Sequence, residues 1–546
     1  MATVARPSRE THEVANQVPP FADVDLLESH PPLVEALERE GGAWARARVG
    51  EAARAYGSAH VLELGRQANE HPPNLRTHDR FGNRVDEVEY HPAYHELMEL
   101  SSGLEVHSLP WTGDEPGRHV ARAATYFCNT EAGHGCPMTM TFAAVPALRA
   151  TPALAAEWEP KLMAASYDPR LVPLGEKDSA KAGMSMTEKQ GGSDVRANTT
   201  IATPLDEDGT YALRGHKWFT SAPMCDVFLT LAQTDDGLSC FLVPRFLPDG
   251  ERNAFRLQRL KDKLGNRSNA SAEVEYDDTW AQLLGEPGRG VPTIIEMVAH
   301  TRLDCVIGSA AGMRWGVANA THHAAHRAAF GKLLADQPLM RNVLADLAIE
   351  SEAATVLALR LARAYDEQDT AFKRLATAVA KFWVCKRFPP HAAEALEVLG
   401  GNGYVEESGM PRLYREAPLN SVWEGSGNVN ALDVLRALVK EPAALDALRA
   451  ELALARGADA RLDAHLDGLD SELPGDPTTL ELRARRVVER LALALQGSLL
   501  VRYAPPAVAD AFCASRLGGD GGLSFGTLPA GCDVEAIVAR HTPELV

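Results

Sequence analysis

The stretch from Glu397 to Asn428, EVLGGNGYVEESGMPRLYREAPLNSVWEGSGN, says most about the fold of this chain. A glycine pair at 400–401 follows an apolar helical pattern, and alone it indicates only the end of a helix, because glycine adopts left-handed dihedral angles at low cost. The closing EGSGN at 424–428 precedes another helical pattern, and alone it indicates a turn with an N-cap. Neither feature alone therefore indicates a particular fold or function, and both must be interpreted together with the rest of the chain.

A second polar stretch, MSMTEKQGGSDVRAN at 184–198, lies where the character of the sequence changes. Apolar residues recur mostly at helical spacing before it, and β-rich runs follow it. Its glycine pair has no βαβ context, so it is neither a Walker loop nor a Rossmann turn. Its backbone amides and hydroxyl groups could hold a polar cofactor, and a plain surface turn is the alternative.

The 546 residues suffice for two to four packed units. Helical patterns dominate the first 180 residues, and Asp235-Asp236-Gly237 divides a later β-rich run as a hairpin turn would. Long alanine- and leucine-rich helical patterns then return, with lengths suited to a four-helix bundle. We predict an α+β multidomain fold, with an N-terminal helical domain at 1–180, a central β-barrel or sandwich at 181–285, a C-terminal four-helix bundle at 286–440 and an appended helical domain at 441–546.

Composition narrows the function classes. A formal net charge of −19 argues against general attraction to nucleic acid or to an anionic membrane surface. The eight cysteines are scattered without a CxxC pair, so we expect reduced core residues, with neither a metal cluster nor a disulfide framework. No apolar run approaches the roughly 20 residues that span a bilayer, and no signal-peptide pattern opens the chain, so we expect a cytoplasmic protein.

Together, the two polar stretches resemble two motifs of the acyl-CoA dehydrogenase family, in the same order. The first motif runs hydrophobic, Ser or Thr, Glu, two variable residues, small, Gly, Ser or Thr, Asp, and the segment 186–194 follows it; only Ser185 departs from the usual pattern. The second motif combines an acidic or amide residue, Gly-Gly-x-Gly and an acid, base, acid ladder. It falls here on Glu397, Gly400, Gly401, Gly403, Glu407, Arg412 and Glu416.

The resemblance covers about residues 80 to 440 and implies the fold of the family and an FAD cofactor. It implies that Met186 and Thr187 approach the pyrimidine end of the flavin and that Ser193 reaches the pyrophosphate. In KWFTS at 217–221 the tryptophan of the family packs on the flavin and the threonine hydroxyl lies near N5. The expected cofactor residues in this part of the chain are Met184, Met186, Thr187, Ser193, Trp218, Thr220, Gly400, Gly401, Ser426 and Asn428.

A further element concerns a neighbouring subunit. The segment HRAAFGK at 326–332 resembles the Arg-x-x-Phe-Gly element, which in this family reaches across a dimer interface to the FAD of the neighbour. The guanidinium group of Arg327 suits a diphosphate, because it offers two parallel charge-assisted hydrogen bonds. Phe330 completes the element, and Gln337 stands one place before the usual glutamine position. The resemblance implies a homotetramer built as a dimer of dimers.

The predicted reaction requires a base. Oxidation of an acyl thioester at its α and β carbons removes a weakly acidic α proton while hydride leaves the β carbon for flavin N5. A carboxylate does this best when burial against an aromatic surface raises its pKa toward the working pH. We therefore predict Glu424, next to Trp423, as the base in oxidation of a short or branched acyl-CoA. Some family members take the base from a helix position that is Thr301 here, which offers no carboxylate.

Three segments are closer to the AidB-like, alkylation-response branch of the family: 11–20, 77–89 and 187–192. This branch is associated with protection of DNA and with binding of double-stranded DNA through its C-terminal domain, so a DNA-binding flavoprotein is the alternative function. Residues 440–546, however, hold 11 Lys plus Arg against 16 Asp plus Glu, which opposes binding of a phosphate backbone. The candidate DNA contacts are Arg483, Arg485, Arg486 and Arg490, for which a solvated helix face is the other interpretation.

Overall fold

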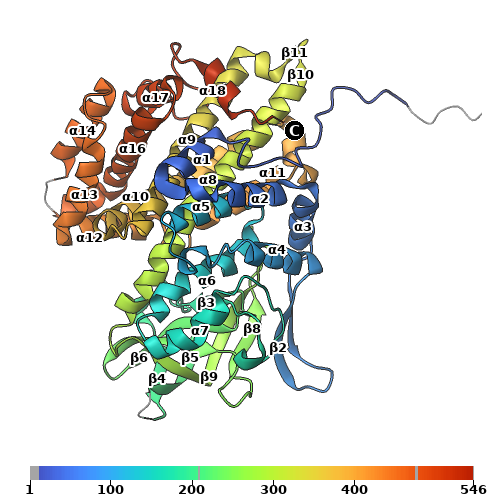
Figure 1. The fold of residues 1–546 in the computed structure, drawn as a ribbon, viewed down its shortest axis with the longest axis vertical. Coiled ribbons are helices and arrows are strands. Elements are labelled where there is room, and N and C mark those ends of the chain that lie inside the picture. The colour runs from blue at the N-terminus through green and yellow to red at the C-terminus, as the bar shows by residue number, and fades with distance from the viewer. Residues whose placement is uncertain (1–10, 207–208, 474–476, 545–546) are drawn as a thin grey trace, which may run out of the picture.

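The computed structural model describes residues 11–206, 209–473 and 477–544. A β domain lies at one end of its longest axis, and a larger helical part occupies the other (Figure 1). This arrangement confirms the predicted fold class, with helical units before and after a central β domain. The helices of the N-terminal part are α1 (Pro31–Leu37), α2 (Arg46–Gly57), α3 (Ala59–Glu70), α4 (Pro92–Gly103), α5 (Arg118–Phe127), α6 (Ala132–Leu148) and α7 (Pro152–Leu162).

The N-terminal part also contains a β-hairpin that the sequence did not reveal. Strands β1 (Asn74–His78) and β2 (Arg84–Glu89) pair antiparallel, and the hairpin overlaps the block 77–89 that resembles the AidB-like branch. The hairpin is tied to the β domain through Asp86, whose side chain accepts a hydrogen bond of 3.1 Å from the backbone N–H of Leu257. β1 alternates between exposed and half-buried residues, and β2 buries only Asp86 and Val88, so the hydrophobic pattern gave little indication of the two strands.

The β domain is a seven-stranded sheet that closes on itself. The strand order is β3-β6-β4-β5-β9-β7, and β6 also pairs with β7. Thr234 pairs with Gly237, so Asp235 and Asp236 form the two-residue hairpin loop that the sequence predicts. The strands are β3 (Ala182–Ser185), β4 (Ile201–Pro204), β5 (Thr210–Ser221), β6 (Val227–Thr234), β7 (Gly237–Pro244), β8 (Phe255–Leu260) and β9 (Ser271–Leu284).

Three long helices, α8 (Gly290–His326), α9 (Pro338–Asp366) and α10 (Thr370–Val398), form the centre of the helical part. A small hairpin, β10 (Ala328–Ala329) and β11 (Lys332–Leu333), joins α8 to α9 at the far end from the β domain (Figure 1). The short helix α11 (Met410–Glu416), the turn η9 (Leu419–Ser421) and α12 (Gly427–Lys440) then carry the chain past α8 and α10.

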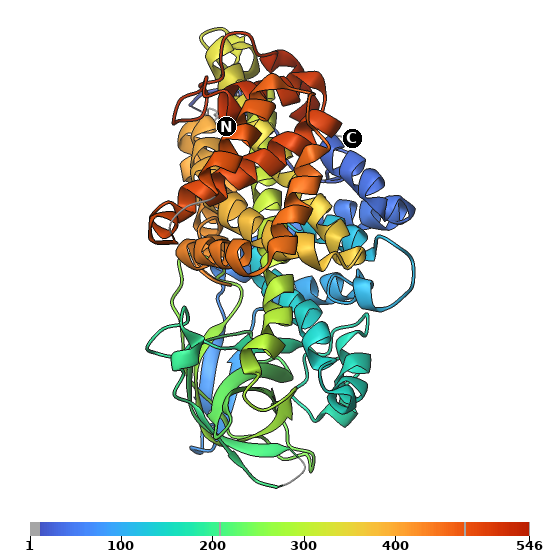
Figure 2. The same cartoon turned by 90° about the vertical axis from the view of Figure 1, so that its left-hand side faces the viewer.

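The remaining helices pack against this centre and share its hydrophobic core (Figure 2). Trp383 of α10 donates a hydrogen bond of 3.0 Å to Gln496, and Arg360 of α9 forms a buried ion pair with Glu451. In the described part of the chain, no helix is both long and apolar enough to cross a membrane. These last helices are α13 (Pro442–Ala453), α14 (Ala460–Glu472), α15 (Pro477–Leu482), α16 (Ala484–Tyr503), α17 (Pro506–Phe512) and α18 (Val534–His541).

Candidate active site

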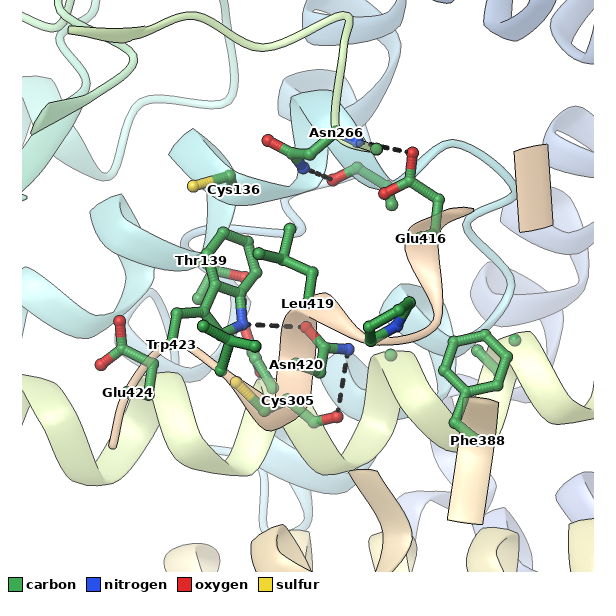
Figure 3. A pocket seen from close by; sticks show the side chains of 18 of the residues that line it. Cys136, Thr139, Asn266, Cys305, Phe388, Glu416, Leu419, Asn420, Trp423 and Glu424 are labelled. Atoms are coloured by element: carbon green, nitrogen blue, oxygen red, sulfur yellow. Dashed lines mark hydrogen bonds between the residues drawn. The ribbon is translucent and has the colours of Figure 1, made fainter. Parts of the chain in front are cut away.

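A cavity of about 780 Å³ lies where α6, α8 and the β domain meet the segment from α11 to α12. Residues from both motif-bearing stretches of the sequence, 184–193 and 409–426, line it, although more than 200 residues separate the two stretches. Figure 3 shows Glu424 and Trp423 at one end of this pocket and Phe388 at the other, with α8 running beneath them. The cavity is therefore the place where the two motifs act together.

The backbone around Glu424 is held by two cationic side chains. Lys381 of α10 donates hydrogen bonds of 2.6 and 2.5 Å to the carbonyl oxygens of Trp423 and Gly425. Arg302 of α8 donates one of 3.0 Å to the carbonyl oxygen of Glu424 itself. Glu424 has a φ of 56°, a left-handed conformation that costs a residue with a Cβ free energy and persists only where the surroundings enforce it. These contacts supply that enforcement and point the carboxylate into the cavity.

The carboxylate of Glu424 has one neutral hydrogen-bond donor. Thr301 Oγ1 of α8 donates to Glu424 Oε2 at 2.6 Å. Burial raises the pKa of Glu424 above its usual value, and the Thr301 hydrogen bond and the charges of Lys381 and Arg302 oppose this rise only in part. A carboxylate with a raised pKa is a stronger base than a solvated one, which suits removal of a weakly acidic proton.

Trp423 forms the aromatic wall beside this carboxylate. Its indole Nε1 donates a hydrogen bond of 2.9 Å to Asn420 Oδ1, and Asn420 Nδ2 in turn donates one of 3.4 Å to the carbonyl oxygen of Cys305 (Figure 3). Asn420 Nδ2 also donates one of 3.1 Å to Ser309 Oγ of α8. The ring orientation is thus fixed from its polar edge, while its face remains available to the cavity.

The stretch 184–193 supplies a polar rim to the cavity. Met184, Met186, Thr187 and Ser193 all line it, as does Gly192. A Cβ at Gly192 would lie 2.3 Å from Thr187 Oγ1, so only glycine allows the backbone to pass this close to the hydroxyl group. Hydroxyl groups and backbone amides that converge on one cavity fit the polar part of a flavin cofactor.

A buried ion pair anchors this rim to the β domain. Glu188 lies 3.0 Å from Lys217 Nζ, and both side chains are fully buried. Glu188 also accepts hydrogen bonds from the hydroxyl groups of Thr199 and Thr200 at 3.0 and 2.6 Å. Burial lowers the pKa of Lys217 to about 8 in spite of its partner. The carboxylate oxygens of Glu188 thus bond to Lys217, Thr199 and Thr200, and these bonds hold the rim in place without contacting a ligand.

Trp218 and Thr220 are not among the residues that line the cavity. The pairing of β5 with β9 shifts between Lys217 and Thr220, where a β-bulge adds one residue to β5. Phe219 and Ser221 consequently face the cavity, and Thr220 is buried with its hydroxyl 2.5 Å from Ser185 Oγ. Ser185, the residue that departs from the first motif, is therefore the hydrogen-bond partner of the motif threonine.

Of the other cofactor residues expected from the sequence, only Ser426 lines the cavity. Ser426 lines the cavity beside Gly425, whereas Asn428 lies on the exposed side of α12 and accepts a hydrogen bond of 2.8 Å from Arg485. Five further expected residues do not line the cavity either. Gly400 and Gly401 lie in an exposed turn, and Arg327, Phe330 and Gln337 lie in or beside the β10–β11 hairpin.

Sequence reasoning missed a polar cluster on another wall of the cavity. Glu416 accepts a hydrogen bond of 2.7 Å from the backbone N–H of Asn266, and burial raises the pKa of Glu416 to about 7. Lys263 donates to the carbonyl oxygen of Asn269 at 2.7 Å, and burial lowers its pKa to about 8. Glu416 was recognised only as part of the acid, base, acid ladder, and Lys263 carried no motif signal.

The four arginines proposed as DNA contacts lie in or just before the first half of α16, and three of them donate hydrogen bonds to other residues of the protein. Arg485 donates to Asn428, and Arg490 donates a hydrogen bond of 3.2 Å to the carbonyl oxygen of His465. Arg483 donates to the carbonyl oxygen of Thr479 at 3.3 Å, and Arg486 is exposed. DNA contact by this group stays a prediction.

Comparison with known proteins agrees with this site. Three family models match the chain: the N-terminal domain of the adaptive response protein AidB over residues 16–169, the acyl-CoA dehydrogenase middle domain over 183–279 and the acyl-CoA dehydrogenase C-terminal domain over 288–439. The chain is 48% identical over 522 residues to AidB of Escherichia coli (strain K12), which covers 94% of this chain and 96% of that protein.

Two further relatives extend the comparison. Acyl-CoA dehydrogenase family member 11 of Caenorhabditis elegans is 35% identical over 405 residues, which cover 69% of this chain and 64% of that protein. The crystal structure of Caenorhabditis elegans ACDH-11 in complex with C11-CoA matches with a TM-score of 0.82 and 28% identity, over 94% of this chain and 95% of that one. The chain therefore belongs to the acyl-CoA dehydrogenase family, in its AidB-like branch, and FAD is the cofactor of this family.

Proposed function

We propose that the protein oxidises the bond between the α and β carbons of an acyl-CoA thioester, with Glu424 as the base that accepts the α proton. The observation that carries this proposal is the position of Glu424, with a buried carboxylate on one side of a cavity whose other side is formed by the polar rim 184–193. A base and a set of polar groups that can hold a flavin, both in one cavity, are what this reaction requires.

The residues of this chain have distinct tasks in the reaction. Met184, Met186, Thr187, Ser193 and Ser426 line the cavity and would hold FAD there. Bound FAD supplies the acceptor for the hydride that leaves the β carbon, at its N5 position.

Glu424 takes the α proton, and Thr301 stabilises the ionised carboxylate before the transfer. Lys381 and Arg302 keep the Glu424 backbone in place, so the base needs little reorganisation when the substrate binds.

A second subunit fits the position of the β10–β11 hairpin. Phe330 stands at its tip with 97% of its surface exposed, and Phe330 and Gly331 both have positive φ, as a tight two-residue turn requires. We propose that Arg327, Phe330 and Gln337 contact the FAD of a neighbouring subunit in a homotetramer, because they do not line the cavity of their own chain.

The test begins with the visible spectrum of the purified protein and continues with anaerobic titration by acyl-CoA thioesters. Bleaching of a yellow flavin supports the proposal, and it is contradicted if the protein retains no flavin or if no acyl-CoA reduces it. The sequence predicts a short or branched acyl group, and the C11-CoA complex of ACDH-11 shows that a relative binds a longer one. Salt-sensitive retention of duplex DNA would support the DNA-protective alternative, which no contact in the described residues favours over the dehydrogenase.

A further inference from the structure

One face of α8 forms a continuous wall of the cavity well beyond the base. Thr301, Cys305, Gly308, Gly312 and Trp315 line it at the spacing of one helix face. Thr301 marks the position of the base, because its hydroxyl bonds to Glu424. At about 1.5 Å of rise per residue, Trp315 lies roughly 20 Å along the helix from Thr301. The lined length therefore exceeds what a short acyl group would occupy.

The side chains that line the cavity beside this face of α8 are mainly apolar. Tyr126 and Phe127 line it from the end of α5, Leu419 lines it from η9, and Phe388 lines it from α10. Figure 3 shows Leu419 between Glu424 and Phe388, with the helix running alongside all three. An apolar lining favours a hydrocarbon chain, because each buried methylene group contributes to binding.

Two glycines of α8 contribute differently to this passage. A Cβ at Gly312 would lie 2.1 Å from the ring of Phe388, so Gly312 makes room for that ring. A Cβ at Gly308 would meet only Asn420 Nδ2 at 3.5 Å and Tyr126 at 3.9 Å, which are ordinary contact distances. A Cβ at position 308 would thus fit without a clash, and a side chain as large as leucine there would project into the cavity that Gly308 lines.

Segments close to both chain termini close the distal end. Leu26 and Ser29, before α1, line the cavity there together with Arg314. Arg314 donates hydrogen bonds of 2.6 Å to the carbonyl oxygen of Ser29 and of 2.8 Å to that of His541, at the end of α18. These two bonds direct the guanidinium group toward the protein, so its charge is satisfied without a ligand.

We propose that this cavity holds a long, unbranched acyl chain, which runs from Glu424 along α8 past Gly308 toward Trp315. The inference rests on the proposed function, because it names the acyl-CoA class that the same site takes. An extended hydrocarbon chain advances by about 1.25 Å per carbon–carbon bond, so roughly 16 bonds are needed to cover the roughly 20 Å between Thr301 and Trp315. Chain length beyond that of octanoyl-CoA is thus recognised by the distal half of the cavity.

Binding is measured separately from oxidation. The FAD-loaded Glu424→Gln variant is titrated with butyryl-, octanoyl-, dodecanoyl- and hexadecanoyl-CoA, and the dissociation constants are obtained by calorimetry. Each added methylene should tighten binding by up to roughly fourfold while it still enters the cavity. An affinity that stops rising at octanoyl-CoA overturns the inference and leaves the proposed function intact. Absence of binding by every thioester contradicts both.

Two variants that place a larger side chain in the cavity test where the acyl chain lies. Gly308→Leu and Ala311→Leu fill the same face of α8, and three residues, or about 4.5 Å of helix rise, separate them. In each variant the affinity should stop rising beyond a limiting acyl chain length. This limit should be about four carbons longer for Ala311→Leu than for Gly308→Leu.

Gly316→Ala is the matched control, because Gly316 packs against Ala395 and does not line the cavity. Its chain-length profile should equal that of the unchanged protein. Should Gly308→Leu fail to fold, Ala311→Leu alone still tests the path. Identical profiles for both blocking variants and the unchanged protein overturn the inference.

Discussion

Thr301 Oγ1 and Glu424 Oε2 lie 2.6 Å apart, in a hydrogen bond that the threonine donates. The two residues are 123 positions apart in the sequence, and they are the two positions that the family resemblance offers for the base. The two positions considered for the base are therefore neighbours in the structure, and a base at either one would reach the same proposed substrate position. In this chain the carboxylate occupies one point and a neutral donor occupies the other.

The first prediction concerns the pH dependence of proton removal. Burial raises the pKa of Glu424, and the Thr301 hydrogen bond favours its ionised form. Thr301→Ala should therefore raise the pKa of Glu424 further, because the ionised carboxylate loses this hydrogen bond. The rate of anaerobic flavin reduction is measured as a function of pH. The pH at which this rate begins to rise should be higher in the variant than in the unchanged protein. Thr321→Ala, whose hydroxyl bonds within α8, is the control that should leave the profile in place.

The second prediction moves the base. Because the two side chains meet, Glu424→Gln combined with Thr301→Glu should regain part of the flavin reduction that Glu424→Gln alone loses. The carboxylate would return to the same region of the cavity from α8, with some loss of alignment. Stopped-flow rates of bleaching compare the two variants. No recovery in a double variant that binds flavin would argue against a shared substrate position.

The third prediction concerns the ion pair beneath the polar rim. Glu188→Gln leaves Lys217 buried without its partner, and loss of one member of a buried pair costs about 3–5 kcal/mol. Urea unfolding should show this loss, and the variant should also release flavin more readily. Glu188→Gln combined with Lys217→Met should recover much of the stability. The exposed pair of Glu286 and Arg289 provides the control, since Glu286→Gln should cost less than about 1 kcal/mol.

The fourth prediction concerns Glu416. Burial raises its pKa from 4.5 to about 7, so the folded protein binds this proton more tightly than the unfolded chain does. The resulting stabilisation is fully present below about pH 4.5 and is lost as the pH rises through about 7. Glu416→Gln should remove this dependence of stability on pH. Between about pH 5 and 8, the melting temperature of the variant should therefore fall less than that of the unchanged protein. Parallel melting curves for both proteins would exclude the raised pKa.

The sequence was sufficient wherever local pattern and motif spacing carry the information. The helical units, the β domain and the hairpin loop at Asp235 and Asp236 follow from periodicity and turn composition. The convergence of 184–193 with 409–426 on one cavity was expected only from the family resemblance, because no local pattern encodes a contact across more than 200 residues.

Other features depend on tertiary structure. A single extra residue in β5 decides that Phe219 and Ser221, rather than Trp218 and Thr220, line the cavity, and a one-residue shift leaves no trace in composition. The cluster of Glu416 with Asn266 joins residues 150 positions apart. Its raised pKa arises from burial, which the sequence pattern does not report.

The central claim is that Glu424 is the base of an FAD-dependent acyl-CoA oxidation, and anaerobic reduction of the flavin tests it most directly. The FAD-loaded protein and its Glu424→Gln variant are mixed with an acyl-CoA that bleaches the unchanged protein, and flavin absorbance is followed with time. The account predicts that both proteins bind flavin and thioester, while the variant bleaches more slowly by at least about two orders of magnitude. Bleaching of the variant at the unchanged rate would contradict it.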